Sequence, residues 1–234
     1  ARHNGNVEAV YTSKTATDCT TGTCALDRER GVLDGISPTP WQTDTCIGEW
    51  HYKRGIKYKT PKKVIDLLVD IVSKNGNLLL NFPLPNSGSL DFAEREVLAG
   101  ITAWMAVNSE GIYATRPWKI YGEGPSTRVV IPSNGKEFDP NENKQPDLTA
   151  ADIRYTTKGS TLYAFMMGWP QGVAVFPALG TSSPQNPAKI TGATMLGDSA
   201  PLRFKQEADG LKVTLPPNRP PTSGLGITLK LTTA

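Results

Sequence analysis

A helix followed directly by a leucine-rich run limits most strongly what this chain can fold into. The stretch "TPKKVIDLLVDIVSKNG" (60–76) places its apolar residues on one broad helical face. Thr60 can cap this helix, Pro61 suits its first position, and Gly76 can end it in a left-handed conformation. Burying six apolar side chains contributes on the order of 10 kcal/mol, which is similar to the entropic cost of ordering the segment. The helix therefore needs a partner surface. Its apolar face is Val64, Ile65, Leu67, Leu68, Ile71 and Val72.

The partner surface follows at once in the run "NLLLNFPLP" (77–85). Three consecutive leucines before a proline-rich turn predict a strand buried on both faces, which is typical of a parallel sheet, with Asn81 at its carboxyl end. The segment 89–111 predicts a second helix, in which Asp91 and Glu94 have the spacing of a capping box. We expect its buried stripe to be Val97, Leu98, Ile101, Trp104 and Met105.

Three more segments predict strands: "VEAVYTS" (7–13), "CALDRERG" (24–31), which Gly31 breaks, and "GIYATRPW" (111–118). Alternating strands and helices favour an α/β barrel or a doubly wound sheet. An eight-stranded barrel needs roughly 250 residues, and only about four barrel-type strands are visible in this sequence. The expected fold of this half is a partial (β/α)8-like barrel that holds its last strands and helices.

The sequence changes character beyond Trp118. A linker rich in Gly, Pro and charged residues precedes two hairpin signals, at Lys158-Gly159 and Asp209-Gly210. Apolar residues alternate with polar ones from 211 to 215 and from 227 to 231, as in half-buried strands. Such short strands predict an antiparallel β-sandwich. We therefore expect three parts: half of a catalytic α/β barrel (1–121), a linker (122–150) and a β-sandwich domain (151–234).

One irregular segment, "PTPWQTDTCIGEWHYKRG" (38–55), combines two tryptophans, two carboxylates, a histidine and a cysteine without a helix or strand period. Long irregular loops in compact domains are usually functional or disordered. Disordered segments avoid Trp, Tyr and Ile, so this composition predicts a functional loop.

The overall composition excludes some classes of protein. The net charge of +3 shows no concentrated basic face for nucleic acid. No apolar run approaches the roughly 20 residues that a membrane-spanning helix needs.

Cys19 and Cys24 flank a turn-like spacer and could form a disulfide in an oxidising compartment. The histidines, His3 and His51, are far apart, which disfavours zinc. The chain opens without methionine or signal region, which suggests a processed, truncated or excised chain.

Several segments together resemble the α-L-fucosidases of glycoside hydrolase family 29. The resemblance covers essentially the whole chain and depends most on "VSKNGNLLLN" and "EGIYATRPW", a specific combination. Further support comes from "PWQTDTCIG" with the following "WHY", and from "YTTKGSTLYAFMMGWP" in the expected sandwich. The resemblance implies that the chain is the second half of such an enzyme. The irregular segment would then be the long loop after the sixth barrel strand, at the face where barrel enzymes keep their active sites.

The resemblance also implies a retaining reaction, which needs two carboxyl groups about 5–5.5 Å apart. The family nucleophile is an aspartate on an earlier strand that this chain lacks. Many members have glutamate as acid/base where Gln42 stands, and an amide cannot transfer a proton at useful rates. We keep Gln42 in the catalytic group for its position and expect Glu29 as the first substitute, since the family's acid/base varies in position. Asp44 and His51 follow, together with Glu49. Alternatively, Glu29 pairs with a neighbouring arginine, Asp44 caps a turn and Glu49 faces solvent.

Four residues are the expected substrate contacts. Arg30 matches a family position whose arginine contacts the sugar, although it could instead pair with Glu29. Trp50 matches an aromatic side chain that packs on the apolar face of fucose, or else it belongs to the core. Trp41 could form an apolar wall for the acid/base, and Asn81 could bind substrate or cap a turn.

We therefore expect a retaining exo-α-L-fucosidase that acts on fucosylated oligosaccharides or glycans, in a portion lacking the nucleophile strand and therefore inactive alone. No metal or organic cofactor is implied. A second hypothesis is a non-catalytic fucose- or glycan-binding protein of the same fold, and a third is a structural half that associates with a separate chain. Half a barrel leaves a sheet edge open, so we expect the missing amino-terminal half as partner, or a homo-oligomer. The substrate class suggests a secreted or periplasmic location.

Overall fold

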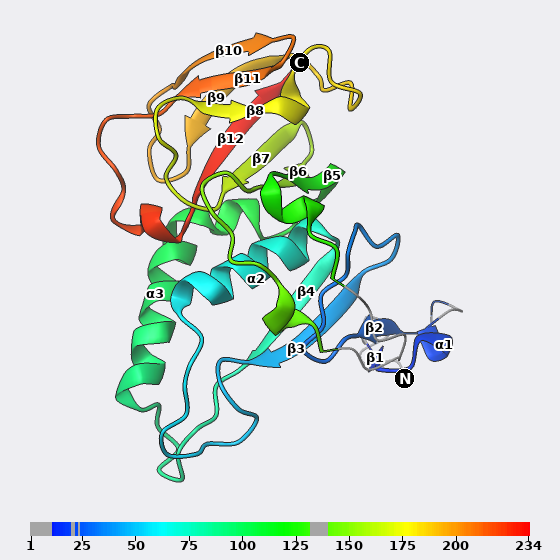
Figure 1. Ribbon diagram of the computed structural model, residues 1–234, viewed down its shortest axis with the longest axis vertical. Coiled ribbons are helices and arrows are strands. Elements are labelled where there is room, and N and C mark those ends of the chain that lie inside the picture. Colours follow the sequence, from blue (N-terminus) through cyan, green and yellow to red (C-terminus); the bar gives the residue numbers. More distant parts are fainter. Residues whose placement is uncertain (1–10, 20–21, 23, 132–139) are drawn as a thin grey trace, which may run out of the picture.

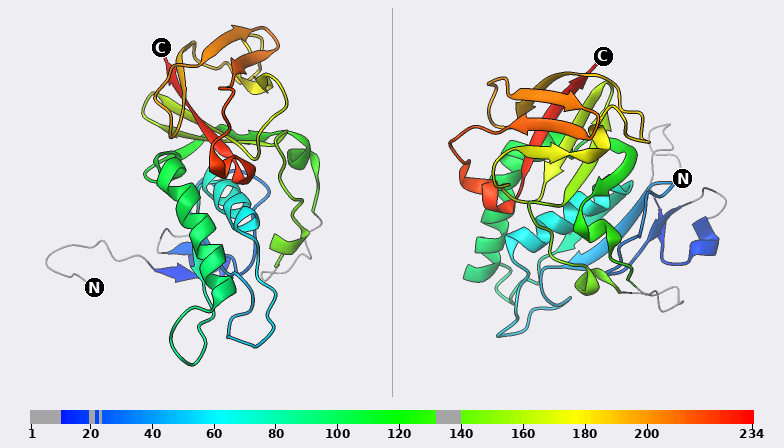
Figure 2. Two further views of the ribbon diagram at one scale, coloured as in Figure 1. Left: turned by 90° about the vertical axis from the view of Figure 1, so that its left-hand side faces the viewer. Right: turned by 45° about the horizontal axis from the view of Figure 1, so that its top comes forward.

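The computed structural model describes residues 11–19, 22, 24–131 and 140–234. These residues form layers that Figures 1 and 2 show stacked on one another. A three-stranded antiparallel sheet packs on a five-stranded antiparallel sheet. A pair of helices covers the other side of that larger sheet, and a four-stranded parallel sheet lies beyond the helices. The chain therefore combines an α/β part with an all-β part, as the sequence predicts.

The parallel sheet has the strand order β1-β2-β3-β4. Its strands are β1 (Thr12–Ser13), β2 (Ala25–Asp27), β3 (Trp41–Cys46) and β4 (Gly76–Asn81). All neighbouring pairs run parallel, and β3 pairs with β4 along its whole length. Because the strands are parallel, their carboxyl ends lie at one edge of the sheet. The predicted strand 7–13 is described only from residue 11 onward; its earlier part lies outside the described residues.

The two faces of this sheet differ in what covers them. Side chains alternate between faces along a strand, and Trp41, Thr43 and Thr45 of β3 are buried on the face toward the helices. On the opposite face, Leu79 of β4 is 56% exposed. The prediction that this strand is buried on both faces is wrong, because no layer of the described residues covers the face that carries Leu79.

The irregular segment 38–55 begins with a strand that the sequence did not reveal. β3 alternates buried and half-buried residues, but two of its buried positions are threonines, so the pattern does not look apolar. Their hydroxyl groups are satisfied inside the protein: Thr43 donates to the carbonyl oxygen of Arg28 at 2.7 Å, and Thr45 donates to Glu142 at 2.6 Å. The prediction of a loop throughout this segment is therefore wrong, although residues 47–55 do form one.

The first of the two helices is α2 (Pro61–Ser73), and its predicted start is confirmed. Thr60 caps it by accepting a hydrogen bond from the Lys63 amide, and Pro61 is its first residue. Its predicted end is wrong: Asn75 takes the left-handed conformation with φ 71°, while Gly76 begins β4. A Cβ on Gly76 would lie 2.6 Å from the ring of Trp41, so this position needs glycine for packing.

The second helix is α3 (Phe92–Asn108). The predicted capping box is confirmed, because Asp91 and Glu94 each accept a hydrogen bond from the other's backbone amide at 2.8 Å. Trp104 is fully buried, as expected, and its indole donates to the Gly226 carbonyl oxygen at 2.9 Å. Leu98 is 40% exposed, so it was wrongly included in the buried stripe.

The antiparallel sandwich contains both predicted hairpins. Its larger sheet has the order β5-β6-β7-β12-β9, and its smaller sheet has the order β10-β11-β8. The strands are β5 (Arg116–Glu123), β6 (Ile153–Lys158), β7 (Thr161–Met166), β8 (Ala174–Phe176), β9 (Ile190–Met195), β10 (Arg203–Glu207), β11 (Gly210–Thr214) and β12 (Ile227–Thr233). The strand expected at 111–118 begins only at Arg116 and pairs antiparallel with β6, so it belongs to the sandwich and not to the parallel sheet.

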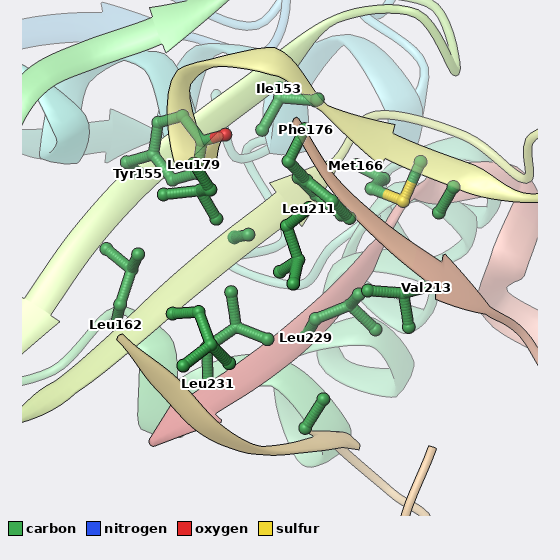
Figure 3. Close-up of a cluster of buried hydrophobic side chains, with 14 of the residues drawn as sticks. Ile153, Tyr155, Leu162, Met166, Phe176, Leu179, Leu211, Val213, Leu229 and Leu231 are labelled. Carbon is green, nitrogen blue, oxygen red and sulfur yellow. The ribbon is translucent and has the colours of Figure 1, made fainter. Parts of the chain in front are cut away.

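The larger sheet is buried on both faces. Leu162, Ala164 and Met166 of β7 pack inside the sandwich. Figure 3 shows Leu162 and Met166 among residues of both sheets. Tyr163 and Phe165, between them in sequence, pack instead in a cluster with residues of α2 and α3, including Trp104. The sandwich and the helices therefore share one apolar layer.

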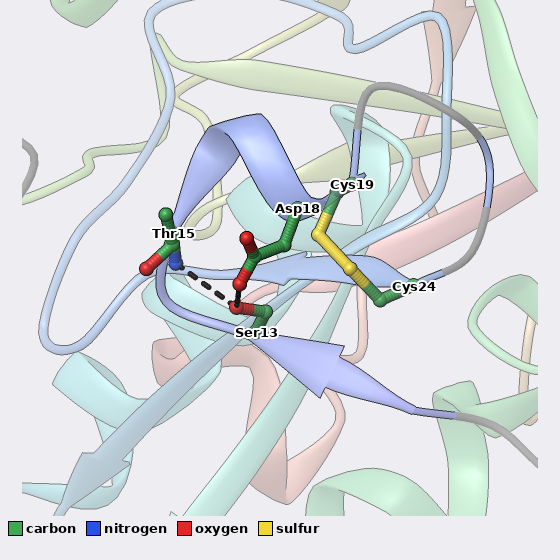
Figure 4. Close-up of a disulfide and its surroundings, with 5 residues drawn as sticks. All are labelled: Ser13, Thr15, Asp18, Cys19 and Cys24. Carbon is green, nitrogen blue, oxygen red and sulfur yellow. Dashed lines mark hydrogen bonds between the residues drawn. A yellow bond between two sulfur atoms is a disulfide. The ribbon is translucent and has the colours of Figure 1, made fainter.

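Short elements complete the described chain. Five short 3-10 segments lie between the longer elements: η1 (Ser109–Gly111), η2 (Pro125–Arg128), η3 (Glu142–Lys144), η4 (Pro177–Leu179) and η5 (Pro221–Leu225). A four-residue helix, α1 (Ala16–Cys19), follows β1, and Cys19 is joined to Cys24 by the expected disulfide (Figure 4).

Candidate functional site

The carboxyl ends of β1, β2 and β3 bring four charged side chains together. Lys14, just after β1, donates to both carboxylate oxygens of Asp44 at 2.9 Å. The same ammonium lies 3.4 Å from Glu29, just after β2, and 3.6 Å from Asp27, at the end of β2. Three carboxylates therefore surround one lysine. We call Lys14, Asp27, Glu29 and Asp44 the carboxylate group.

Asp27 differs from the other carboxylates in its surroundings. It is buried, and its Oδ1 has no hydrogen-bond partner among the described residues. Burial raises the pKa of Asp27, the charge of Asp44 raises it further, and Lys14 opposes both effects. For Lys14, burial acts to lower the pKa, but the hydrogen bond to Asp44 and the three negative charges outweigh it, so the pKa is raised. Asp27 therefore takes up a proton more readily than an ordinary aspartate does.

An aromatic ring borders the carboxylate group on one side. The Trp50 indole donates to Glu29 Oε1 at 3.1 Å, which fixes the carboxylate against the ring. The guanidinium of Arg30 lies over the Trp50 ring, 5.2 Å from its centroid, as in a cation–π contact. Asn81, at the end of β4, donates to the Trp50 carbonyl oxygen at 3.2 Å. Glu29, Arg30, Trp50 and Asn81 thus form one connected set.

Arg30 is held in an unusual backbone conformation. Its φ of 50° is in the left-handed region, which costs energy for a residue other than glycine. Two backbone hydrogen bonds hold it there: its amide donates to the Asp44 carbonyl oxygen at 2.8 Å, and its carbonyl oxygen accepts from the Glu142 amide at 2.9 Å. Its side chain donates to Cys46 Sγ at 2.8 Å and to the Gly48 carbonyl oxygen at 3.3 Å. Backbone and side chain together aim the guanidinium at Trp50.

Not all of the predicted residues join this set. Trp41 is 1% exposed, and its indole donates to the Lys74 carbonyl oxygen, so it packs in the core at the amino end of β3. The prediction that Trp41 forms an apolar wall beside the acid/base is wrong, because its side chain lies on the helix-covered face of β3, opposite to the face that carries Asp44. His51 and Glu49 are both exposed in the loop. For Glu49, this agrees with the alternative that its side chain faces solvent.

Gln42 stands next to the carboxylate group without being part of it. In β3 it lies two residues before Asp44 and therefore on the same face, and its register partner on β2 is Asp27. Sequence reasoning missed Asp27 and Lys14. A signal was available for Lys14, which directly follows the expected strand 7–13, where parallel strands collect their functional groups. Asp27 lies in the middle of the expected strand 24–31, and only the observed end of β2 reveals its place.

This arrangement suits proton transfer beside a developing positive charge. Glu29 has a carboxylate oxygen held by an indole, and the group carries three acidic side chains against one lysine. Negative charge stabilises an oxocarbenium-like transition state, and a positioned carboxyl group can protonate a leaving oxygen. Within the described part of the chain, no cluster of histidine, cysteine and acidic residues could hold a metal ion. None of the helices described there is long and apolar enough to cross a membrane.

Comparison with known proteins identifies similar chains over both parts. The family model described as alpha-L-fucosidase matches residues 1–110, and the model described as alpha-L-fucosidase C-terminal domain matches residues 145–232. Tissue alpha-L-fucosidase from Rattus norvegicus is 30% identical over 203 residues, which are 82% of this chain and 37% of that protein. The Homo sapiens tissue enzyme is 29% identical over 182 residues, covering 75% and 33%. The chain thus spans about a third of the length of these relatives.

Solved structures agree with the fold. An alpha-L-fucosidase structure superposes with a TM-score of 0.69 at 20% identity, covering 89% of this chain and 42% of that one. The Thermotoga maritima alpha-fucosidase in complex with fucose superposes with a TM-score of 0.66, also at 20% identity, over 90% of this chain and 45% of the other. These identities support the fold alone.

Proposed function

Because this chain belongs to the α-L-fucosidase family, we propose that the complete protein removes terminal α-L-fucose from oligosaccharides or glycans by an exo-acting, retaining hydrolysis. The matched region is only 37% and 33% of the two relatives that carry this name. The activity is therefore proposed for the full-length protein, with the described residues forming one side of its site.

The observation that carries the proposal is the position of Glu29. Glu29 lies just after the carboxyl end of β2 in the parallel sheet. Its carboxylate accepts a hydrogen bond from the Trp50 indole and lies 3.4 Å from the Lys14 ammonium. We assign it the role of general acid and base, which Gln42 cannot perform because an amide does not exchange a proton at useful rates. The Bacteroides thetaiotaomicron relative was trapped as a covalent intermediate in a glutamate-to-glutamine variant, which supports a retaining route.

In this proposal, the sugar lies against Trp50 and Arg30. The indole offers an apolar face to the methyl side of fucose, and the guanidinium offers several N–H donors to its oxygens. Asp44 stays close enough to add negative charge as the glycosidic bond breaks. The nucleophile and the opposite wall of the pocket come from polypeptide outside the described residues.

The exposed face of the parallel sheet supports the proposal that a further part of the protein packs on it. Leu79 and the polar positions beside it would be covered if more strands closed the sheet into a barrel. We propose that the amino-terminal half of the barrel lies there. The Cys19–Cys24 disulfide is typical of proteins in oxidising compartments and supports a secreted or periplasmic location.

The test is hydrolysis of a chromogenic α-L-fucoside by the full-length protein and its Glu29→Gln variant. Removing a general acid/base lowers kcat by about 10²- to 10⁴-fold. Glu49→Gln is the matched control, since Glu49 is exposed in the neighbouring loop and should leave kcat unchanged. Proton NMR of the first product should show the α-anomer. Equal turnover of the Glu29 variant and the wild-type protein would exclude Glu29, and an initial β-anomer would exclude retention.

A second candidate function is fucose binding without catalysis. The half-buried Gln42 at the family's acid/base position favours it. Binding of fucose to the full-length protein, with no hydrolysis of any fucoside, would replace the enzymatic proposal with this one.

A further inference from the structure

The segment before the sandwich returns to the candidate site and binds it at several points. Asn141 exchanges two hydrogen bonds with the backbone of Val32, at 2.8 and 3.0 Å, just after the loop that carries Glu29 and Arg30. The next residue, Glu142, donates its amide to the Arg30 carbonyl oxygen at 2.9 Å. Residues more than a hundred positions apart in the sequence therefore meet at the edge of the parallel sheet.

The side chain of Glu142 reaches the neighbouring strand. Its Oε2 accepts from the Thr45 hydroxyl at 2.6 Å, and its Oε1 accepts from the Lys59 ammonium at 3.0 Å. Lys59 also donates to the Cys46 carbonyl oxygen at 2.6 Å. The side chain of Glu142 is 3% exposed and that of Lys59 is 12% exposed, so this ion pair is shielded from water.

These contacts converge on Arg30. Its left-handed backbone is held between the Asp44 carbonyl oxygen and the Glu142 amide. Its guanidinium contacts Cys46 Sγ, and Cys46 follows Thr45, which binds the Glu142 carboxylate. One residue therefore fixes both the backbone of Arg30 and the strand end against which its guanidinium rests.

We infer that Glu142 is a positioning residue for substrate binding: through Thr45, Lys59 and the Arg30 backbone, it sets the guanidinium of Arg30 over Trp50. Glu142 itself touches no reacting group. The inference rests on the proposed function insofar as Arg30 and Trp50 hold the sugar. It predicts that the segment leading into the sandwich controls affinity for fucose, although it lies outside the carboxylate group.

The first test is the kinetics of Glu142→Gln in the full-length protein with a chromogenic fucoside. Gln keeps the size and one acceptor but removes the charge that Lys59 needs. We expect KM to rise about tenfold and kcat to change less than threefold. Glu123→Gln is the matched control: Glu123 is also a hydrogen-bonded glutamate and is half-buried, but it binds Tyr155 and the Ala178 amide inside the sandwich. An equal rise in KM for both variants would contradict the inference, since a general loss of stability would then explain it.

Thr45→Val is a second variant in case Glu142→Gln folds poorly. It is nearly isosteric and removes only one hydrogen bond to Glu142. We expect a smaller rise in KM in the same direction, about threefold. In an Arg30→Lys background, neither Glu142→Gln nor Thr45→Val should raise KM further, because both act through the guanidinium. Fully additive effects would overturn the inference.

A thiol-labelling test does not depend on hydrolysis. Cys46 is the one cysteine outside the disulfide, and it is buried beneath Arg30. Under native conditions, Glu142→Gln should speed the reaction of Cys46 with a thiol reagent at least fivefold, whereas Glu123→Gln should not. An unchanged rate of Cys46 labelling in Glu142→Gln would contradict the inference, even if the protein hydrolyses fucosides. Faster labelling in a protein that neither binds nor hydrolyses a fucoside would uphold the positioning role and reject the proposed function.

Discussion

The sandwich and the parallel sheet differ in what buries their apolar faces. Among the described residues, the sandwich core contains 17 buried residues, all contributed by the sandwich strands and their connections. Two clusters beneath the parallel sheet contain four and three buried residues, most of them from α2 and α3, and the other face carries the exposed Leu79. A two-sheet structure can bury its own apolar face, whereas a parallel sheet depends on layers added from outside. In this chain, the candidate site lies on the parallel sheet, the one with an exposed face.

The largest effect is expected where the two parts meet. Asp70 on α2 accepts hydrogen bonds from Lys74 at 2.7 Å and from Arg154 on β6 at 2.6 Å. All three side chains are less than a tenth exposed. Asp70→Ala would leave two buried cations unpaired, and we expect a loss of about 3–5 kcal/mol in the free energy of unfolding. Urea denaturation of the full-length protein measures this value.

Glu207→Ala is the control for Asp70→Ala, because Glu207 also pairs with two lysines but lies at the surface of the sandwich. It should leave the unfolding midpoint unchanged, since exposed ion pairs contribute little. Similar unfolding midpoints for Asp70→Ala and Glu207→Ala would show that the ion pairs of Asp70 do not stabilise the contact between the helices and the sandwich.

A matched pair of leucines compares the two sheets directly. Leu229 of β12 is fully buried in the sandwich core, and Leu79 of β4 is 56% exposed. We expect Leu229→Ala to lower the free energy of unfolding by about 2–5 kcal/mol. In this chain alone, Leu79→Ala should cost less than about 0.5 kcal/mol. In the full-length protein, the same change should cost more if further strands cover this face, and equal costs in both forms would argue against such cover.

The acidity of Asp66 provides a pH test on the helix between the sheets. Burial raises the pKa of Asp66 to about 6, although Lys62 acts in the opposite direction. Since the folded pKa exceeds the ordinary value near 4, ionisation opposes folding. Relative to Asp66→Asn, the wild-type protein should lose stability as the pH rises from about 4 to about 6, by on the order of 2 kcal/mol, and then stay level. Parallel stability profiles for the two proteins across this range would contradict the raised pKa.

The smallest effect is expected at a helix end. Asp91 accepts from the Glu94 amide and begins α3, which packs against both parts. Asp91→Ala removes this cap and should cost about 1 kcal/mol. Thermal unfolding followed by circular dichroism measures it, with Asp91→Asn as the control that keeps an acceptor. A lower midpoint for Asp91→Asn than for Asp91→Ala would show that the cap is unimportant.

The sequence predicts the elements whose signals are local. Thr60, Pro61 and the Asp91–Glu94 box mark helix ends through contacts within a few residues, and the two hairpins follow from their turns. β3 escaped prediction because its buried positions, Thr43 and Thr45, are polar and are satisfied by distant partners. The strand at 111–118 was assigned to the wrong sheet, because pairing with β6 depends on residues far along the chain.

The candidate site was predicted in part for the same reason. Glu29, Arg30 and Trp50 follow from resemblance and from their place at strand ends. Lys14 was overlooked although it directly follows an expected strand, whereas Glu142 reaches the site through contacts that no local pattern records. Trp41 is fully buried against Gly76 and takes no part in the site, although it lies only three residues before Asp44 in the sequence.

The larger antiparallel sheet has a consequence for domain exchange. Its second face is covered by α2 and α3, and Trp104 and Phe165 interlock across that boundary at a centroid distance of 6.3 Å. A sandwich transplanted alone into another protein would carry an uncovered aromatic surface and would tend to aggregate. A working chimaera would have to move the two helices together with the sandwich, so the transferable module is larger than the all-β part.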